Sequence, residues 1–310
     1  MGLSTSYSSC KFPSPHITAF LPSTTICPGS SPIRPERTKR PSTMGEAATL
    51  TSPDKELYQT KFDPKAYLTF CYQLVESPKQ KDNSRFVTFT LCHLSQAFSS
   101  GKYRGQRLIE VGTGPTIHTL ISACDYFEEI VVSDYSNANR NELEKWLSAE
   151  EDCFNWDAHI QFVCDLEKKR TPEVVKQTLR RKIKQVLKCD VSMENPFHPV
   201  VVEPADCVVS SLCLEAACKD HHDYRRSLGT MVGLLREGGL LVLIGDLNET
   251  FYTVKGQRFS CVSVSEEFIR QTLGELGLTV LGFEVQPAGE RDPSLKCDYE
   301  ASFFLLAQKK

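Results

Sequence analysis

The chain has 310 residues, of which 40% are hydrophobic, and its formal net charge is -3. Such a chain can bury one large core, so we expect a single α/β domain of roughly 250 residues and a tail, working as a monomer. The charge gives no general attraction to nucleic acid or anionic membranes, and no apolar run is long enough for a transmembrane helix. We therefore expect no nucleic-acid or membrane partner.

The cysteines indicate the compartment. There are 13 of them, an odd number, with no C-x-x-C pair, and Cys124, Cys164, Cys207 and Cys213 lie inside apolar runs. This pattern favours free thiols in a reducing compartment, the cytoplasm, over disulfides, and it lacks the ligand spacing of a zinc site. We predict no metal.

Residues 1–50 are rich in Ser, Thr and Pro, with no acid before Glu36. Such a segment cannot bury enough apolar surface to offset its ordering entropy, so we expect a disordered tail before a folded domain at 51–310. Three other interpretations stay open. The first six residues fit a loose myristoylation pattern, the composition suits a transit peptide, and Met44 could be the start of the working protein.

Two helices are predicted before the first strand. Residues 61–72 have Pro64 near a helix start and aromatic residues beyond it, and residues 84–98 carry Phe86, Phe89, Leu91 and Leu94 at helical spacing. We expect the first helix to pack on the core through its rings and the second to be scaffold.

A strand, a glycine turn and a helix are predicted from residue 108 onward. The strand 108–111 is mostly apolar, Gly112 and Gly114 allow a tight turn, and apolar residues recur at helical spacing from Ile117 to Cys124. The free N–H groups at such a turn can receive polar ligand groups, although a glycine turn alone can also serve geometry only.

A second apolar run, residues 129–134, ends in Asp134, twenty residues after Gly114. A parallel strand there would bring a carboxylate to the ribose hydroxyls of a nucleoside. The turn reads E-x-G-x-G-P rather than G-x-G-x-x-G. S-adenosylmethionine, which has ribose and adenine but no phosphate, therefore fits better than a dinucleotide.

The middle of the chain reads as a short strand at 160–163, a basic helix within 168–184 and a strand at 185–191 that carries Asp190. The basic helix could be a nucleic-acid patch. We favour a solvated face with Val174, Val175 and Leu179 on its other side. The basic residues are Lys168, Lys169, Arg170, Arg180, Arg181, Lys182 and Lys184.

The C-terminal half continues the alternation. Residues 205–212 form a near-continuously apolar strand followed by Glu215, and the next helix, from Tyr224 to Leu235, is expected to end at the Gly238-Gly239 pair. A fifth strand at 240–244 delivers polar residues at its end. A helix at 268–276 and strands at 279–283 and 303–307 complete the chain. The residues delivered by the fifth strand are Asp246, Asn248, Glu249, Thr250 and Tyr252.

The run from Leu108 to Asp134, with Asn139 and residues 143–147 after it, resembles the small-molecule N-methyltransferases of nicotinamide, phenylethanolamine and indolethylamine. The resemblance extends from about Tyr58 to the C-terminus. It implies a class I methyltransferase-like (Rossmann-like), doubly wound and mostly parallel sheet with a C-terminal antiparallel hairpin. It also implies an N-terminal helical lid over S-adenosyl-L-methionine.

The resemblance also implies a set of cofactor-binding residues at the strand ends, where open α/β sheets bind ligands. Glu110 and the glycines should shape the methionine side, Asp134 should bind the ribose, and Asp190 the adenine. His118 stands where the family usually has a tyrosine, and a lone histidine there could equally be a packing or capping residue. The predicted cofactor residues are Tyr67, Tyr72, Glu110, Gly112, Gly114, His118, Asp134, Tyr135, Asn139, Asp190, Val191 and Ser211.

Glu215 and Asp246 are the catalytic candidates, because carboxylates at strand ends can orient an acceptor and offset positive charge forming on its nitrogen. Thr250, Tyr252 and Cys261 join them as predicted substrate residues. Asp246 with Thr250 resembles the nicotinamide enzyme, Glu215 the phenylethanolamine enzyme, and residues 259–262 the indolethylamine enzyme. We expect a nicotinamide-like pyridine first and an aromatic ethylamine second.

Two other classes of protein stay open. A binding homologue that had lost catalysis would be expected to lack acids at Glu215 and Asp246, and a nicotinamide-adenine dehydrogenase would need a phosphate turn where Pro115 stands.

Overall fold

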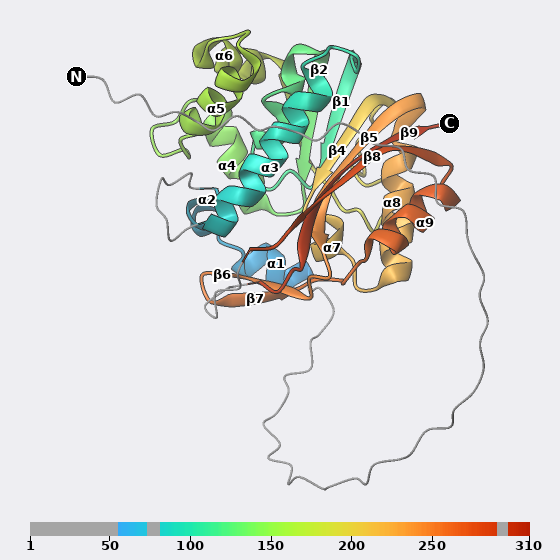
Figure 1. The fold of residues 1–310 in the computed structure, drawn as a ribbon. Helices are drawn as coiled ribbons and strands as arrows, with labels where there is room; N and C mark the ends of the chain where they lie inside the picture. The colour runs from blue at the N-terminus through green and yellow to red at the C-terminus, as the bar shows by residue number, and fades with distance from the viewer. Residues whose placement is uncertain (1–54, 73–80, 290–296) are drawn as a thin grey trace, which may run out of the picture. The chain divides into compact units, whose positions relative to one another are not determined.

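A seven-stranded sheet forms the centre of the molecule in the computed structural model, which describes residues 55–72, 81–289 and 297–310 (Figure 1). The strand order is β3-β2-β1-β4-β5-β9-β8. β1 to β5 run parallel, and β9 is antiparallel to both β5 and β8. The bounds are β1 (Gly105–Val111), β2 (Phe127–Asp134), β3 (Ile183–Lys188), β4 (Ala205–Ser211), β5 (Leu235–Leu247), β8 (Leu278–Pro287) and β9 (Ala301–Lys309).

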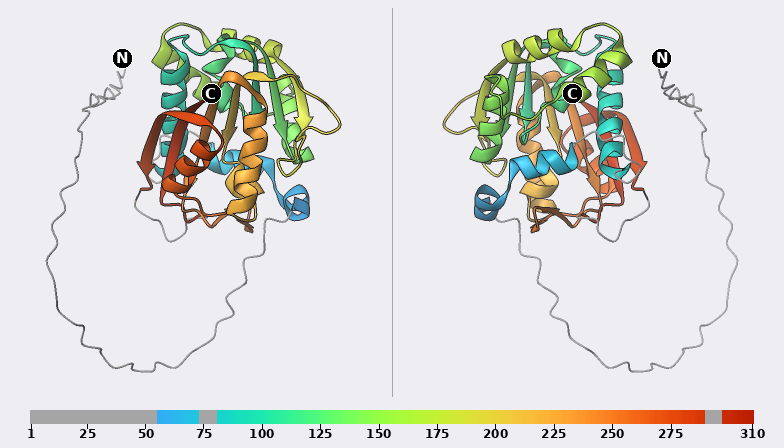
Figure 2. Two further views of the ribbon diagram at one scale, coloured as in Figure 1. Left: turned by 90° about the vertical axis from the view of Figure 1, so that its right-hand side faces the viewer. Right: turned by 90° about the vertical axis from the view of Figure 1, so that its left-hand side faces the viewer.

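Helices cover both faces of this sheet (Figure 2). Successive strand residues point to opposite faces, so Leu108 packs into one apolar core while Ile109 packs into the other. Burial on both sides explains why the central strands read as continuous apolar runs. The first core contains residues of α3 (Lys81–Phe98), α4 (Asn137–Leu147), α5 (Asp157–Glu167) and α6 (Pro172–Lys182); the second contains residues of α7 (Leu214–Ala217), α8 (His221–Gly233) and α9 (Glu266–Glu275).

The topology creates a binding crevice between β1 and β4. From β1 the chain moves outward to β2 and β3, and it then returns to place β4 and β5 on the other side. Such a reversal opens a crevice at the carboxyl ends of the strands. The predicted doubly wound α/β class and its antiparallel C-terminal hairpin are confirmed.

Residues 160–163 are helical, so the strand predicted there is wrong. They belong to α5, where Ile160, Val163 and Cys164 are buried at helical spacing. A four-residue apolar run does not distinguish a buried strand from the inner face of a helix, and here the helix packs beside α3 and α6.

The segment after the glycine turn also differs from the prediction. It forms two 3-10 turns, η1 (His118–Leu120) and η2 (Ala123–Asp125), instead of an α-helix. Residues 115–124 are all buried, so this short connection has no solvent-facing side for an amphipathic helix.

Two helix predictions are corrected by the structure. α8 ends at Gly233, because β5 begins at Leu235 and the two glycines expected to cap the helix lie in an irregular stretch of that strand. The predicted N-terminal helix is two helices, α1 (Lys55–Lys61) and α2 (Pro64–Cys71), because Asp63 caps the second by accepting from the N–H of Ala66.

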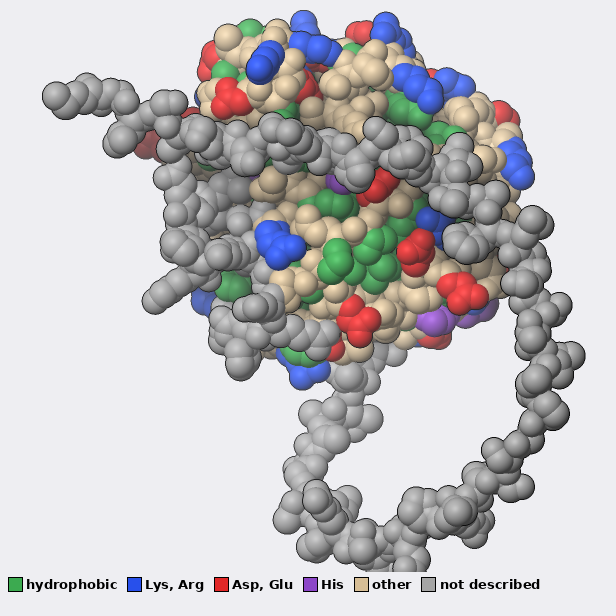
Figure 3. Space-filling model, viewed as in Figure 1, with side chains coloured by type: hydrophobic (Ala, Val, Ile, Leu, Met, Phe, Trp, Pro, Cys, Tyr) green, Lys and Arg blue, Asp and Glu red, His purple; other side chains and the backbone are tan. Residues whose placement is uncertain are grey.

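Two side chains of the basic stretch at 168–184 form ion pairs within the molecule. The Arg170 side chain is paired with Asp125 and Glu167, and Lys176 on α6 pairs with Asp157 and Glu173. In Figure 3, Lys and Arg side chains are interspersed with Asp and Glu over the upper part of this view. Val175 and Leu179 are buried as predicted, whereas Val174 is 49% exposed and belongs to the solvated side.

Within the described ranges, no helix is both long and apolar enough to cross a bilayer. Cys124, Cys164 and Cys207 are free and buried.

The tail predicted at 1–50 lies outside the described residues. We expect a chain that begins at Met44 to be as active and as thermally stable as the full chain, because a segment without core contacts contributes little to folding. Melting temperature and methyl-transfer rate of the two forms test this. A lower melting temperature after truncation would show that the tail is structural.

Candidate active site

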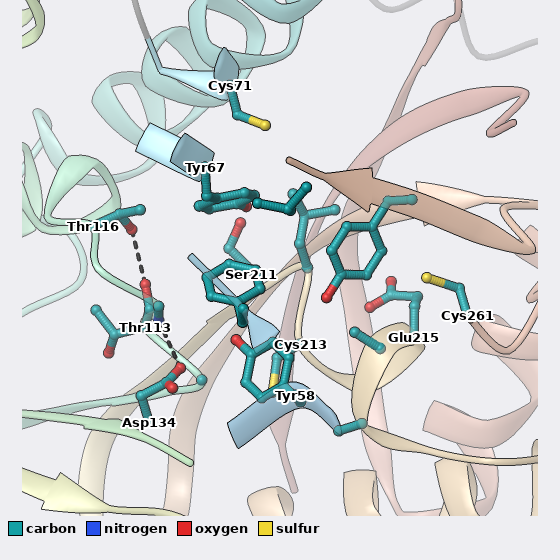
Figure 4. A pocket seen from close by; sticks show the side chains of 18 of the residues that line it. Tyr58, Tyr67, Cys71, Thr113, Thr116, Asp134, Ser211, Cys213, Glu215 and Cys261 are labelled. Carbon is teal, nitrogen blue, oxygen red and sulfur yellow. Dashed lines mark hydrogen bonds between the residues drawn. The ribbon is translucent and has the colours of Figure 1, made fainter. Parts of the chain in front are cut away.

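A single pocket gathers the ends of the parallel strands beneath the two N-terminal helices. Its lining includes Gly112 after β1, Asp134 at the end of β2, Asp190 after β3, Ser211 at the end of β4 and Asp246 near the end of β5. α1, α2 and β6 (Phe251–Val254), which pairs with β7 (Gln257–Ser260), supply further walls. In Figure 4, Asp134 and Glu215 lie on opposite sides, with Tyr58 and Tyr67 between them.

The glycine turn brings backbone against the pocket. Gly112 and Gly114 have φ angles of +70° and +62°, which residues with a side chain rarely adopt. A Cβ at Gly112 would also lie 2.2 Å from the Cys213 sulfur, whereas no atom lies within 4 Å of the Cβ position at Gly114. The turn therefore leaves open space for a ligand at Gly114.

Asp134 is held in place by three hydrogen bonds. Its Oδ2 accepts from the Gly114 N–H at 2.9 Å, and its Oδ1 accepts from the Ser136 N–H at 2.8 Å and the Asn139 amide at 2.9 Å. Burial raises the pKa of Asp134, although these hydrogen bonds favour its ionised form. A carboxylate fixed in this way retains acceptor capacity for ribose hydroxyls.

Asn139, predicted as a cofactor residue, lies outside the pocket lining. Its amide donates to Asp134 and, at 3.0 Å, to the hydroxyl of Tyr58. It therefore positions two lining residues. Tyr58 was not predicted as a site residue.

Asp190 lines the pocket after β3, and Lys55 of α1 lies against it. Lys55 Nζ lies 2.7 Å from both carboxylate oxygens, and Ser192 donates to Oδ1. Burial opposes ionisation, but these hydrogen bonds keep the pKa of Asp190 below its ordinary value. Val191 and Tyr135, also predicted as cofactor residues, line the pocket. The Lys55 contact was missed, since a lysine on an exposed helix gives no sequence signal.

Glu110 lies behind the turn and not in the lining. Its Oε1 accepts from Thr119 at 2.5 Å, and Oε2 has no partner among the described residues. Burial is the largest cause that raises the pKa of Glu110 to about 8. Its predicted contact with the cofactor stays a prediction, and in the structure the residue supports the turn.

These residues fit a nucleoside cofactor without phosphate. The pocket offers a fixed carboxylate, an open glycine turn and the Ser211 hydroxyl, which is buried and has no partner within the described ranges. Thr113 and Thr116, also missed from the sequence, line the same side. No cluster of Lys or Arg that would bind a pyrophosphate occurs among the described lining residues.

The opposite side carries three buried carboxyl groups, Glu215, Asp246 and Glu249. Asp246 Oδ1 accepts from the Ser302 hydroxyl at 2.5 Å, and Glu249 Oε2 accepts from the Cys261 thiol at 3.3 Å. Glu215 Oε1 is buried without a partner in the described part of the chain, close above Gly245. Glu249 follows the fifth strand in the sequence, but its position in the pocket was not predicted.

Burial is the main influence on the charge of this acid cluster. It raises the pKa of Glu215 to about 8 and that of Asp246 to about 7. The pKa of Glu249 is raised well above its ordinary value, by burial and then by repulsion from Asp246. Such a cluster favours a ligand that brings hydrogen-bond donors or positive charge.

Thr250, predicted as a substrate residue, lies outside the pocket lining. Its hydroxyl donates to Asp298 at 2.5 Å, and its N–H donates to the same carboxylate at 2.7 Å. These bonds fix the segment that brings Cys297 and Tyr299 into the lining. Tyr252 and Cys261, also predicted as substrate residues, line the pocket.

Tyrosine side chains form the roof between the two halves. Tyr67 and Tyr72 share a hydrogen bond, and burial is the largest cause that raises the pKa of both, as it does for Tyr252. All three hydroxyl groups are therefore protonated at neutral pH and can donate hydrogen bonds. His118 lines the same part of the pocket.

Comparison with known proteins agrees with this geometry. Residues 51–310 match the sequence family described as the NNMT/PNMT/TEMT family. The chain is 39% identical to nicotinamide N-methyltransferase of Homo sapiens over 256 residues, covering 82% of this chain and 96% of that protein. It is 36% identical to indolethylamine N-methyltransferase of Mus musculus over 255 residues, covering 82% and 95%. It is also 36% identical to phenylethanolamine N-methyltransferase of Homo sapiens over 275 residues, covering 86% and 94%.

Among solved structures, the fold is similar to magnesium protoporphyrin IX methyltransferase from Synechocystis PCC 6803 with bound SAH. The TM-score is 0.52 at 12% identity, with 83% of this chain and 97% of that chain covered. This likeness concerns the fold alone. The sequence match over most of the chain decides the family: the chain belongs to the NNMT/PNMT/TEMT family of S-adenosylmethionine-dependent N-methyltransferases.

Proposed function

We propose that this enzyme methylates the nitrogen of a small aromatic compound, a nicotinamide-like pyridine first. The supporting observation is that one pocket holds both the Asp134 side and the acid cluster of Glu215, Asp246 and Glu249. A methyl donor on the first side and an acceptor on the second would share one cavity. Methyl transfer requires this arrangement, because the nitrogen must approach the methyl group directly.

The cofactor supplies a methyl group on a sulfonium, which is displaced in line by the acceptor nitrogen. Holding two reactants in such alignment can be worth roughly 7–11 kcal/mol. Asp134 and the glycine turn would hold the nucleoside, and Asp190 would bind the adenine amino group. Tyr67 and Tyr72 would cover the reacting groups and exclude water.

The acid cluster would orient the acceptor. Ionised Glu215 or Asp246 accepts a hydrogen bond from a carboxamide and stabilises the positive charge that forms on a pyridine nitrogen. The relative with the highest identity reported above is a nicotinamide N-methyltransferase, which supports the pyridine class.

The acid cluster gives a specific reason for a second candidate, an arylalkylamine. Three buried carboxyls on one side suit an ammonium ligand, and a carboxylate there could also take up the proton that an amine must lose. A pyridine nitrogen carries no such proton. A base is therefore required only for the amine class.

Transfer of radiolabelled methyl groups to a panel of pyridines and arylalkylamines tests the proposal. We expect labelled N-methyl products from pyridines with a carboxamide, and lower turnover of arylalkylamines. Absence of transfer to both classes, with the cofactor bound, would contradict the proposed acceptor.

The pH profile of kcat/KM should distinguish the two acceptor classes. Burial places the pKa of Asp246 near 7 and that of Glu215 near 8, so the rate with a pyridine should rise as these acids ionise and level off above them. With an arylalkylamine it should keep rising toward the pKa of the ammonium, about 10 for a primary alkylamine. A pyridine rate that is flat from about pH 6 upward would show that neither ionisation matters.

We further propose that the enzyme works in the cytoplasm as a monomer. The free buried thiols Cys124, Cys164 and Cys207 support a reducing compartment.

A further inference from the structure

The charges that line the pocket are strongly asymmetric. Five carboxyl groups line it, but among the described lining residues only Lys55 and His118 can carry positive charge. Lys55 already pairs with Asp190, with Nζ 2.7 Å from both oxygens. A ligand that brings a carboxylate therefore has His118 as its possible cationic partner. The five acids are Asp134, Asp190, Glu215, Asp246 and Glu249.

The hydrogen bonds around His118 determine which ring nitrogen carries the proton. The Thr116 hydroxyl donates its single proton to the carbonyl oxygen of Thr113 at 2.9 Å (Figure 4). That hydroxyl also lies 3.1 Å from His118 Nδ1, so it must accept a hydrogen bond from Nδ1–H. Neutral His118 then has a bare lone pair on Nε2, which is buried and has no partner among the described residues.

The groups packed around the ring are uncharged near neutral pH or lie behind the turn. Tyr72 from α2 lies 4.8 Å from the His118 ring, and Trp156 stacks on it at 6.4 Å. Burial lowers the pKa of His159, on α5, to about 4 and raises those of Tyr72 and Glu110, the latter to about 8. No neighbouring charge therefore compensates a ligand carboxylate in place of His118.

We infer that His118 binds the α-carboxylate of the cofactor through Nε2 and takes up a proton to do so. The inference rests on the proposed function, since S-adenosylmethionine and its demethylated product end in an amino acid. A bare Nε2 lone pair would repel a carboxylate, whereas protonated Nε2–H donates a charge-assisted hydrogen bond to it. Cofactor binding and protonation are thus linked.

The direction of the pH dependence follows from this linkage. Without ligand, burial and then His159 lower the pKa of His118 to about 3. A bound carboxylate raises it. Between the free and bound values, the bound state holds more protons, so affinity increases as pH falls, by up to about tenfold per pH unit. Above the pKa of His118 in the bound state, the histidine is neutral with and without ligand. Its contribution to cofactor affinity then no longer depends on pH.

Calorimetry tests this with two ligands and one matched variant. S-adenosylhomocysteine carries the carboxylate, and 5′-methylthioadenosine lacks the whole amino-acid part. Titrations from about pH 5.5 to about pH 8 cover the range in which a histidine with a carboxylate partner is expected to titrate. His118→Tyr keeps a hydrogen-bond donor but loses the imidazole. Titrations in buffers of different ionisation enthalpy count the protons taken up.

We expect the wild type to take up a proton with S-adenosylhomocysteine and to bind it more tightly at low pH than His118→Tyr does. Subtracting the variant removes the contribution of other acids such as Glu110, which are present in both proteins. 5′-Methylthioadenosine should show no difference between them, and His159→Gln should keep the proton uptake. Unchanged melting temperatures verify folding.

Equal pH slopes in wild type and His118→Tyr would overturn the inference. A wild-type affinity that falls at low pH relative to the variant would also overturn it, because Nε2 would then accept a hydrogen bond from the cofactor ammonium. Failure of the wild type to bind S-adenosylhomocysteine at any pH would instead contradict the proposed function itself.

Discussion

We expect Asp246→Ala and Glu215→Gln to lower kcat/KM for the acceptor by about one to two decades while leaving cofactor affinity nearly unchanged. A lost hydrogen bond to a charged group costs about 1.5–3 kcal/mol, which corresponds to that loss of rate. Glu215 lies on the side of the pocket opposite Asp134 (Figure 4), and Asp246 interacts with Glu215, so their loss should not disturb the nucleoside. Steady-state kinetics and calorimetry with S-adenosylhomocysteine measure the two effects.

Two further variants separate charge from shape. Asp246→Asn keeps the hydrogen bond with Ser302 possible but removes the negative charge, so it should show most of the loss if charge stabilisation matters. Thr250→Val serves as the control, because its hydroxyl bonds Asp298 outside the lining, and we expect a smaller loss from it. Equal damage to cofactor binding by both acid variants would mean that these acids belong to the other ligand.

Asp134→Ala should weaken binding of S-adenosylmethionine and S-adenosylhomocysteine by about tenfold to a hundredfold, or about 1.4–2.8 kcal/mol. The substitution removes the carboxylate proposed for the ribose. It also leaves the N–H groups of Gly114 and Ser136 without their acceptor, so the turn loses its support.

The control for this variant is Asn139→Ala, which removes one donor to Asp134 but keeps the carboxylate. We expect a weaker effect from it, measured by the same calorimetric titration. If Asp134→Ala binds both ligands as tightly as the wild type, the nucleoside does not use this carboxylate. Tight binding of a nicotinamide dinucleotide by the wild type would contradict the choice of cofactor.

The sheet could be predicted because its strands are buried on both faces. Continuous apolar runs at 108–111, 129–134 and 205–212 correspond to strands β1, β2 and β4. The prediction of secondary structure failed where one sequence pattern is compatible with two structures. The apolar run at 160–163 is the inner face of an amphipathic helix, and the irregular start of β5 around Gly238 resembles a helix end when only the sequence is read.

The site could be predicted where a chemical group is fixed by a strand end. Asp134, Asp190, Glu215 and Asp246 all follow from that rule, and all line the pocket. Contacts between distant segments could not be predicted. Lys55 reaches Asp190 across 135 positions of sequence.

Side-chain direction is a second property that could not be predicted. Glu110 and Thr250 are close in sequence to lining residues, but their side chains bond Thr119 and Asp298 instead.

The central claim is that one pocket holds the cofactor and the acceptor nitrogen in line. A ligand in which the amino-acid and adenosyl parts of the cofactor are covalently joined to a pyridine carboxamide tests it in one titration. We predict that this conjugate binds at least about tenfold more tightly than S-adenosylhomocysteine, because the second group binds intramolecularly. Asp246→Ala should remove that advantage. A conjugate that binds no more tightly than S-adenosylhomocysteine, in a protein that binds S-adenosylhomocysteine well, would contradict the claim.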